Sequence, residues 1–135
     1  MSQWHLSCTN SMGKVIDDMP LILVAEDDRS NYLLVEVLLK HTYHILHAEN
    51  GIEAVQLFKQ YHPHLILMDI KMPEMDGYEA TQEIRKISST IPIIAITAYA
   101  FSSDEERIMN NGFNAYLVKP IDFAKLKKTI TDFLY

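Results

Sequence analysis

The sequence lacks several features that would assign it to a particular class of protein. Cys8 is the only cysteine, so no disulfide can form within the chain, which is typical of a reducing compartment. No apolar run approaches the roughly 18 residues of a membrane span. The start of the chain lacks the apolar core of a secretory signal, since Asp17 and Asp18 stand where that core would end. We therefore expect a cytoplasmic protein whose ordered part makes no membrane contact.

Positive charge is also scarce. The chain has 12 Lys and Arg against 18 Asp and Glu, which gives a formal net charge of −6. Binding to a nucleic acid backbone needs a concentrated basic face, and the basic residues here are scattered. We therefore expect no nucleic acid partner for this domain, and the excess of acids favours a site for cations.

The chain has the length and composition of one domain. Its 135 residues are 48% hydrophobic, enough for a core around a single sheet. Residues 1–19 show no clean periodicity and are rich in Ser, Asn, Thr and Gly, which predicts an N-terminal tail or linker. The predicted domain therefore covers residues 20–135.

Short apolar runs alternate with helical patterns from Pro20 onward. The predicted strands are 21–25, 43–48, 65–68, 93–96 and 116–118, and each is followed by a predicted helix. Such alternation indicates a parallel sheet with helices on both faces, and five units are too few for a closed barrel. We therefore predict a doubly wound (βα)5, flavodoxin-like, three-layer α/β sandwich with strand order 2-1-3-4-5.

The spacing of apolar residues predicts which helix faces are buried. In the helix expected over residues 30–40 and in the last helix, one apolar stripe is expected to face the sheet. The expected core-facing residues are Leu33, Leu34, Val37, Leu38, Phe123, Leu126, Ile130 and Phe133.

Acidic side chains follow two predicted strands that would be neighbours. Glu26 and Asp27 come after the first strand, and Asp69 ends the third. Taken alone, Asp69 could simply begin a turn, but the carboxyl ends of adjacent parallel strands open into one crevice. Two carboxylates about 4 Å apart repel by roughly 4 kcal/mol at an effective dielectric constant near 20. A cluster of three therefore calls for a cation.

The chemistry of these residues predicts a phosphate-bearing ligand with Mg²⁺. Hard oxygen donors with incomplete coordination suit Mg²⁺, and no EF-hand loop favours Ca²⁺. Thr97 and Lys119 end the fourth and fifth strands, where a hydroxyl and an ammonium could neutralise the remaining phosphoryl oxygens.

Four sequence segments together resemble the receiver domain of two-component response regulators. They read VAEDD, LMDIKMPEMDG, IIAITA and YLVKP, and the match runs from about Pro20 to Tyr135. Because Glu26 stands where Asp is commonest, the pattern is most similar to receivers of hybrid sensor histidine kinases. The resemblance implies that Asp69 accepts a phosphoryl group from the phosphohistidine of a histidine kinase or histidine phosphotransfer protein.

The resemblance also implies roles for other residues. Tyr116 would be the switch aromatic, and a plain core position is its main rival, because buried Tyr is ordinary. The Lys119–Pro120 bond would be cis. The implied Mg²⁺ ligands are Glu26, Asp27, Asp69 and the backbone carbonyl of Lys71, and the implied phosphate-binding and switch residues are Thr97, Lys119 and Tyr116.

The same resemblance implies a signalling protein whose only chemistry is self-phosphotransfer and slow autodephosphorylation. It allows a weak or phosphorylation-dependent dimer, and either a stand-alone receiver or a part of a hybrid histidine kinase. The main alternative is a Mg²⁺-dependent phosphatase with an aspartate nucleophile. Against it, the position two residues after Asp69 carries Lys71 rather than an acid. A pseudo-receiver that only binds partners, and a flavodoxin proper, fit the site positions less well.

Overall fold

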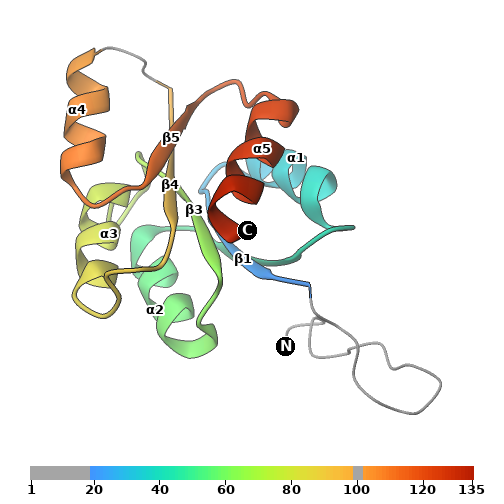
Figure 1. Cartoon of the computed structure of the whole chain (residues 1–135). Coiled ribbons are helices and arrows are strands. Elements are labelled where there is room, and N and C mark those ends of the chain that lie inside the picture. Colours follow the sequence, from blue (N-terminus) through green and yellow to red (C-terminus); the bar gives the residue numbers. More distant parts are fainter. Residues whose placement is uncertain (1–18, 99–101) are drawn as a thin grey trace.

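The structure, a computed structural model, describes residues 19–98 and 102–135. The tail predicted at 1–19 thus lies almost wholly outside the described residues. Strands and helices alternate along the rest of the chain (Figure 1). Their bounds are β1 (Leu21–Ala25), α1 (Arg29–Leu39), β2 (His44–Ala48), α2 (Gly51–Tyr61), β3 (Leu65–Asp69), α3 (Gly77–Arg85), β4 (Ile93–Thr97), α4 (Ser102–Asn110), β5 (Ala115–Val118) and α5 (Phe123–Leu134).

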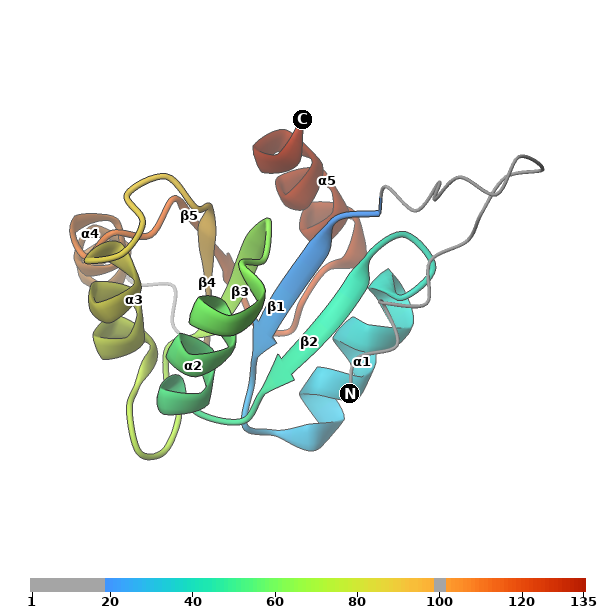
Figure 2. The ribbon, with the colours of Figure 1, turned by 90° about the horizontal axis from the view of Figure 1, so that it is seen from below.

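The strands form one parallel sheet in the order β2-β1-β3-β4-β5. Helices α1 and α5 cover one face, and α2, α3 and α4 cover the other (Figures 1 and 2). Every residue of β1, β3 and β4 is buried, because helices lie over both of their faces. The predicted doubly wound fold and strand order are confirmed.

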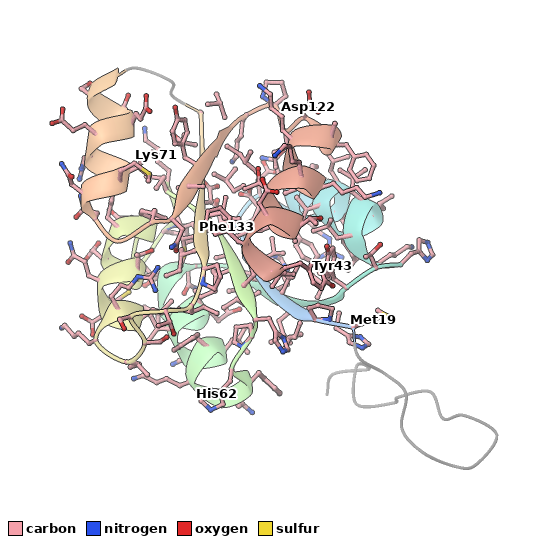
Figure 3. The ribbon with its side chains drawn as sticks, in the orientation of Figure 1. Met19, Tyr43, His62, Lys71, Asp122 and Phe133 are labelled. Carbon is pink, nitrogen blue, oxygen red and sulfur yellow. The ribbon has the colours of Figure 1, made fainter. Side chains whose placement is uncertain are left out.

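The register of the sheet decides which strand ends meet. Ala25 of β1 is opposite Met68 of β3, so the next residues, Glu26 and Asp69, leave the sheet side by side. Thr97 of β4 is opposite Val118 of β5, so Lys119 follows beside Thr97. The carboxyl edge of the sheet therefore collects all four side chains. In Figure 3, Lys71 lies at this edge and His62 at the opposite one.

The prediction for the buried face of the first helix is wrong. The buried residues of α1 are Tyr32, Val35 and Leu39. Leu33, Leu34 and Val37 are 40%, 49% and 58% exposed, and only Leu38 of the predicted stripe packs partly against the core. The Tyr32 ring stacks on His47 of β2 at a centroid distance of 3.6 Å, and this contact turns the Tyr32 stripe toward the sheet.

The prediction for the last helix is half correct. Leu126 and Ile130 of α5 are fully buried, but Phe123 and Phe133, at the two ends of the predicted stripe, are exposed. Phe123 is the first residue of α5 and Phe133 the last but one, so both lie at the ends of a helix whose middle packs against β3 and β5.

Arg85 joins α3 to the two loops below it. Its guanidinium donates to the carbonyls of Gly112, Ser88 and Ile91 at 2.9, 3.2 and 2.7 Å, and to Asn114 Oδ1 at 2.8 Å. These hydrogen bonds hold the turn between α4 and β5 against α3.

Of the helices in the part of the chain that the structure describes, none is long and apolar enough to cross a bilayer.

Candidate functional site

Three carboxylates converge at the carboxyl edge of the sheet. One oxygen from each of Glu26, Asp27 and Asp69 lies within 4.8 Å of the others. Glu26 and Asp69 are only 4% and 5% exposed, whereas Asp27 is open to solvent. The convergence expected from the sequence is therefore present, and it follows from the adjacency of β1 and β3.

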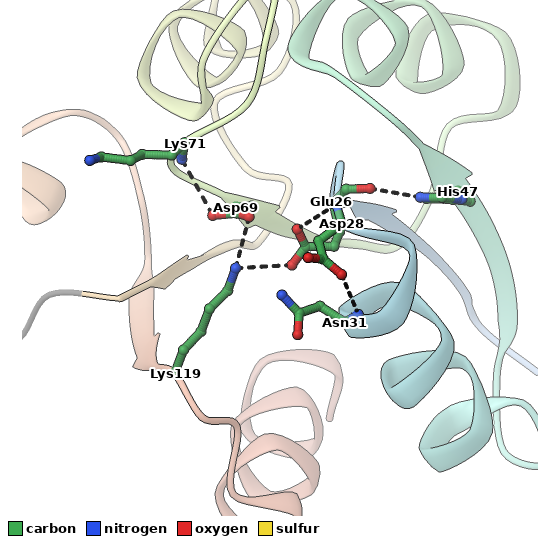
Figure 4. Close-up of polar contacts among 7 residues, drawn as sticks. All are labelled: Glu26, Asp28, Asn31, His47, Asp69, Lys71 and Lys119. Atoms are coloured by element: carbon green, nitrogen blue, oxygen red, sulfur yellow. Dashed lines mark hydrogen bonds and ion pairs between the residues drawn. The ribbon is translucent and has the colours of Figure 1, made fainter.

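Lys119 bridges the two buried acids. Its Nζ lies 2.9 Å from Asp69 Oδ2 and 3.1 Å from Glu26 Oε1 (Figure 4). Burial lowers the pKa of Lys119, but the hydrogen bonds and charges of Asp69 and Glu26 outweigh it, so the net shift of the pKa is upward. Lys119 follows β5 directly, and its bond to Pro120 is cis.

One ammonium does not balance this acidic cluster. Burial raises the pKa of Glu26 to about 7, and the hydrogen bond and the charge of Asp69 contribute to the rise. The backbone N–H of Asp28, which donates to Glu26 Oε2 at 3.2 Å, and Lys119 oppose that rise. Without a further cation, Glu26 thus retains a proton for much of the time at neutral pH.

The cluster opens into a cavity of about 410 Å³. Thr97, which is buried, contributes to its wall, and the N–H of Lys71 donates to Asp69 Oδ1 at 3.3 Å. Figure 4 shows the side chain of Lys71 directed away from the carboxylates. The lining is formed by Glu26, Asp27, Asp28, Asn31, Asp69, Ile70, Lys71, Tyr78, Thr97, Ala98, Asp104, Arg107 and Lys119.

The donor set fits Mg²⁺. The three carboxylates are hard oxygen ligands, and Asp27 remains exposed, so water or phosphate oxygens could supply the remaining ligands of such an ion. The pKa of Glu26 is raised mainly by burial and further by the hydrogen bond and charge of Asp69, so a bound cation would favour the ionised form of Glu26. The residues that are present therefore suit this ion in both chemistry and charge.

Tyr116 lies on the strand next to the site. It is half-buried and packs against the core beneath α2, α3 and α4. Partial burial raises the pKa of Tyr116, and a hydrogen bond with the Glu105 carboxylate raises it further. Its hydroxyl is thus linked to α4.

The sequence reasoning missed three contributors, which are His47, Arg107 and Tyr78. His47 Nε2 contacts the Glu26 carbonyl at 2.7 Å (Figure 4). The His47 ring also stacks on Tyr32, so β2 and α1 both support the acidic loop. Arg107 and Tyr78 line the cavity from α4 and α3. The alternating pattern gave no signal for these residues, because each reaches the site through packing between distant segments.

The geometry agrees with a comparison against known families. Residues 22–131 match the family model of the response regulator receiver domain. The chain belongs to this family. Among similar proteins, the polar-differentiation response regulator DivK of Brucella ovis is 38% identical over 116 residues, which cover 84% of this chain and 94% of DivK. This receiver domain therefore takes part in two-component signalling.

Solved structures with the same fold are also receiver domains. The receiver domain of the sensor histidine kinase PA1611 from Pseudomonas aeruginosa matches with a TM-score of 0.80 and 36% identity, over 85% of this chain and 97% of that one. That structure has a magnesium ion coordinated in its active-site cleft. The receiver domain of Ssk1 from Saccharomyces cerevisiae, crystallised with the histidine phosphotransfer protein Ypd1, matches with a TM-score of 0.80 and 32% identity, over 85% and 90% of the two chains.

Proposed function

We propose that this receiver domain accepts a phosphoryl group onto Asp69 from a phosphohistidine donor and then changes conformation. The observation that carries the proposal is the setting of Asp69. Its carboxylate is held 2.9 Å from Lys119 Nζ, and two further acids lie within 4.8 Å, at the wall of an open cavity. An acid is rarely buried beside other acids unless the arrangement serves a function.

In the proposed reaction, an oxygen of the Asp69 carboxylate attacks the phosphorus atom. The bond between phosphorus and the donor imidazole breaks, an acyl phosphate forms, and the imidazole nitrogen takes a proton from solvent. Lys119 remains within reach of the new phosphoryl oxygens, and the Thr97 hydroxyl can donate to another. Asp69 needs no general base, because it attacks as a carboxylate.

Glu26, Asp27, Asp69 and the Lys71 carbonyl would hold Mg²⁺. When bound, the ion supplies positive charge that offsets the repulsion between Asp69 and the incoming phosphoryl group. The donor set supports this assignment, and the magnesium ion in the similar PA1611 receiver is a second line of support.

Thr97, Lys119 and Tyr116 are proposed to carry the conformational switch. Phosphorylation adds negative charge where Lys119 now binds two carboxylates, which gives Lys119 and Thr97 a new partner. The hydrogen bond from Tyr116 of β5 to Glu105 of α4 supports this proposal, because a rearrangement of β5 near Lys119 can reach α4 through it.

The exposed face of α1 is the proposed docking site for the donor protein. Leu33, Leu34 and Val37 form an apolar patch on a helix whose first turn contains Asn31, which lines the cavity. A phosphohistidine must enter this cavity, so its protein covers the adjoining surface. A histidine kinase or a histidine phosphotransfer protein fits this surface, and Ssk1 is seen bound to such a partner.

The proposal has further parts that rest on the resemblance. The receiver domain is assigned to residues 20–135, the cytoplasm is the expected compartment, and any dimer is expected to be weak or dependent on phosphorylation. Slow autodephosphorylation is the only hydrolysis expected.

Intact mass spectrometry tests the phosphoacceptor. The protein is incubated with acetyl phosphate, with and without Mg²⁺, alongside the Asp69→Asn and Asp28→Asn variants. One phosphoryl group should be added to the wild type and to Asp28→Asn in the presence of Mg²⁺, and none to Asp69→Asn. Uptake by Asp69→Asn would refute the assignment, and rapid turnover of p-nitrophenyl phosphate by the wild type would favour the phosphatase alternative.

A transfer assay tests the docking surface. Val37→Glu should slow phosphoryl transfer from a phosphorylated histidine phosphotransfer protein and leave uptake from acetyl phosphate unchanged. Ile52→Glu, an exposed apolar position on α2, is the matched control. Equal slowing by both variants would contradict docking on α1.

A further inference from the structure

Arg107 of α4 lies at the cavity that contains Asp69. Its Cζ is 4.1 Å from the centroid of the Tyr78 ring on α3, and both residues line the cavity. Tyr78 is buried and held edge-on by Phe113 at a centroid distance of 6.0 Å. The guanidinium therefore rests on a fixed aromatic surface beside the site, while the Arg107 side chain itself is exposed.

The charges around the cavity give Arg107 a distinct position among the cations. Lys119 is already bound to Glu26 and Asp69. The side chain of Lys71 extends away from the carboxylates (Figure 4). Among the described residues, no ion pair joins the Arg107 guanidinium to a carboxylate. Its cation–π contact with the Tyr78 ring is weak, so breaking this contact costs little.

We propose that Arg107 binds the phosphoryl group on Asp69 and that its transfer from the Tyr78 ring to the phosphoryl oxygens moves α4 relative to α3. This inference rests on the function proposed above and adds a residue to it. A phosphoryl group carries a charge of about −1.5 to −2, and a planar guanidinium binds such oxygens in a bidentate manner. Because Arg107 is on α4 and Tyr78 is on α3, the exchange of partners couples phosphorylation to the packing of these helices.

A purely structural role for Arg107 makes a different prediction. If the guanidinium only packs on Tyr78, its removal lowers the stability of the resting and activated forms equally. If it also binds the phosphoryl group, its removal destabilises the activated form more than the resting form, which loses only the contact with the Tyr78 ring. The affinity for a phosphoryl mimic depends on the free-energy difference between the resting and activated forms, so a change in this affinity decides between the two roles.

The test uses beryllofluoride with Mg²⁺ as a phosphoryl mimic. Its affinity is measured for the wild type, Arg107→Gln, Arg107→Lys and Lys128→Gln, the last being an exposed cation on α5 that changes the net charge equally. Arg107→Gln should weaken the affinity roughly two- to fivefold, as expected for one solvent-exposed ion pair. The wild type should lose more affinity than Arg107→Gln when the salt concentration rises, because salt screens the ion pair between Arg107 and the mimic, which only the wild type makes. Arg107→Lys should recover part of the loss, and Lys128→Gln should bind as the wild type.

A direct signal comes from the side chain itself. The Nε–Hε NMR resonance of Arg107 should shift when beryllofluoride and Mg²⁺ are added, and Tyr78→Leu should shift it in the resting form. Equal affinities for the wild type and Arg107→Gln, or an Arg107 resonance that does not move, would overturn the inference while leaving phosphorylation of Asp69 intact. A wild type that neither binds the mimic nor takes up phosphate would overturn both proposals.

Discussion

Replacing Asp69 by Asn should change the stability of the metal-free protein with a sign that depends on pH. The carboxylate of Asp69 is repelled by Glu26 and Asp27 and attracted by Lys119. Asn keeps nearly the same volume and removes the charge. The stability difference between the two proteins therefore reports the balance of these interactions.

The distances set the magnitude when all the acids are ionised. At an effective dielectric constant near 20, each repulsion is worth about 3.5 kcal/mol when the upper limit of 4.8 Å is taken as the separation, and the attraction at 2.9 Å is worth about 6 kcal/mol. The two repulsions exceed the one attraction by about 1 kcal/mol. At about pH 8, Asp69→Asn should thus be more stable than the wild type by roughly that amount.

Lowering the pH reverses the balance through Glu26. Its pKa is raised from 4.5 to about 7 in the folded protein. As the pH falls, Glu26 therefore binds a proton at a higher pH in the folded protein than in the unfolded chain. The ionised Glu26 carboxylate lowers the free energy of unfolding. This loss of stability is absent below pH 4.5, grows between pH 4.5 and about 7, and reaches its full size above that range. With Glu26 neutral, one repulsion disappears, and Asp69 becomes net favourable by about 2 kcal/mol.

Urea unfolding followed by circular dichroism, in EDTA at about pH 8 and about pH 5.5, measures the difference. Asp69→Asn should be the more stable protein at the higher pH and the less stable at the lower pH, a swing of about 3 kcal/mol that equals the interaction of Asp69 with Glu26. The exposed Asp132→Asn on α5 is the control. A stability difference that does not change with pH would refute the proposed coupling of Glu26 and Asp69.

Three further predictions concern residues around the site. Lys71→Ala should change the lifetime of the phosphorylated protein, because Lys71 is two residues beyond Asp69 and its positive side chain can affect the access of water to the acyl phosphate, and equal lifetimes would refute that role. Arg85→Met should lower the free energy of unfolding by about 2–4 kcal/mol, since four acceptors lose a charged donor, whereas Lys86→Met should have little effect in the same urea titration. Gly77→Ala would place Cβ 2.4 Å from the Asp69 carbonyl oxygen, so it should reduce both stability and phosphoryl uptake, and unchanged uptake by mass spectrometry would contradict the close approach.

The fold was predictable because its signals are local. Each buried strand is a short apolar run, each helix has its own periodicity, and the topology rule for flavodoxin-like doubly wound sheets supplies the strand order. The same rule brings Glu26 and Asp69 together, since they follow adjacent strands. Lys119 was expected near them because it ends the strand at one side of the same edge.

The buried face of α1 was not predictable in this way. Two overlapping stripes of α1 are apolar, and both satisfy the helical period. The stack of Tyr32 on His47 selects one of them, and His47 is 15 positions further along the chain on another strand. The stripe that contains Leu34 and Val37 remains exposed and becomes the proposed docking surface.

The sequence by itself determined the parallel sheet, the acids at its carboxyl edge and the need for a cation, because these follow from residue type, periodicity and topology. The tertiary structure alone decided the ion pairs of Lys119, the raised pKa of Glu26 and the position of Arg107 over Tyr78. Those properties depend on distances of a few ångströms between segments far apart in the chain, and on the degree to which water is excluded between them.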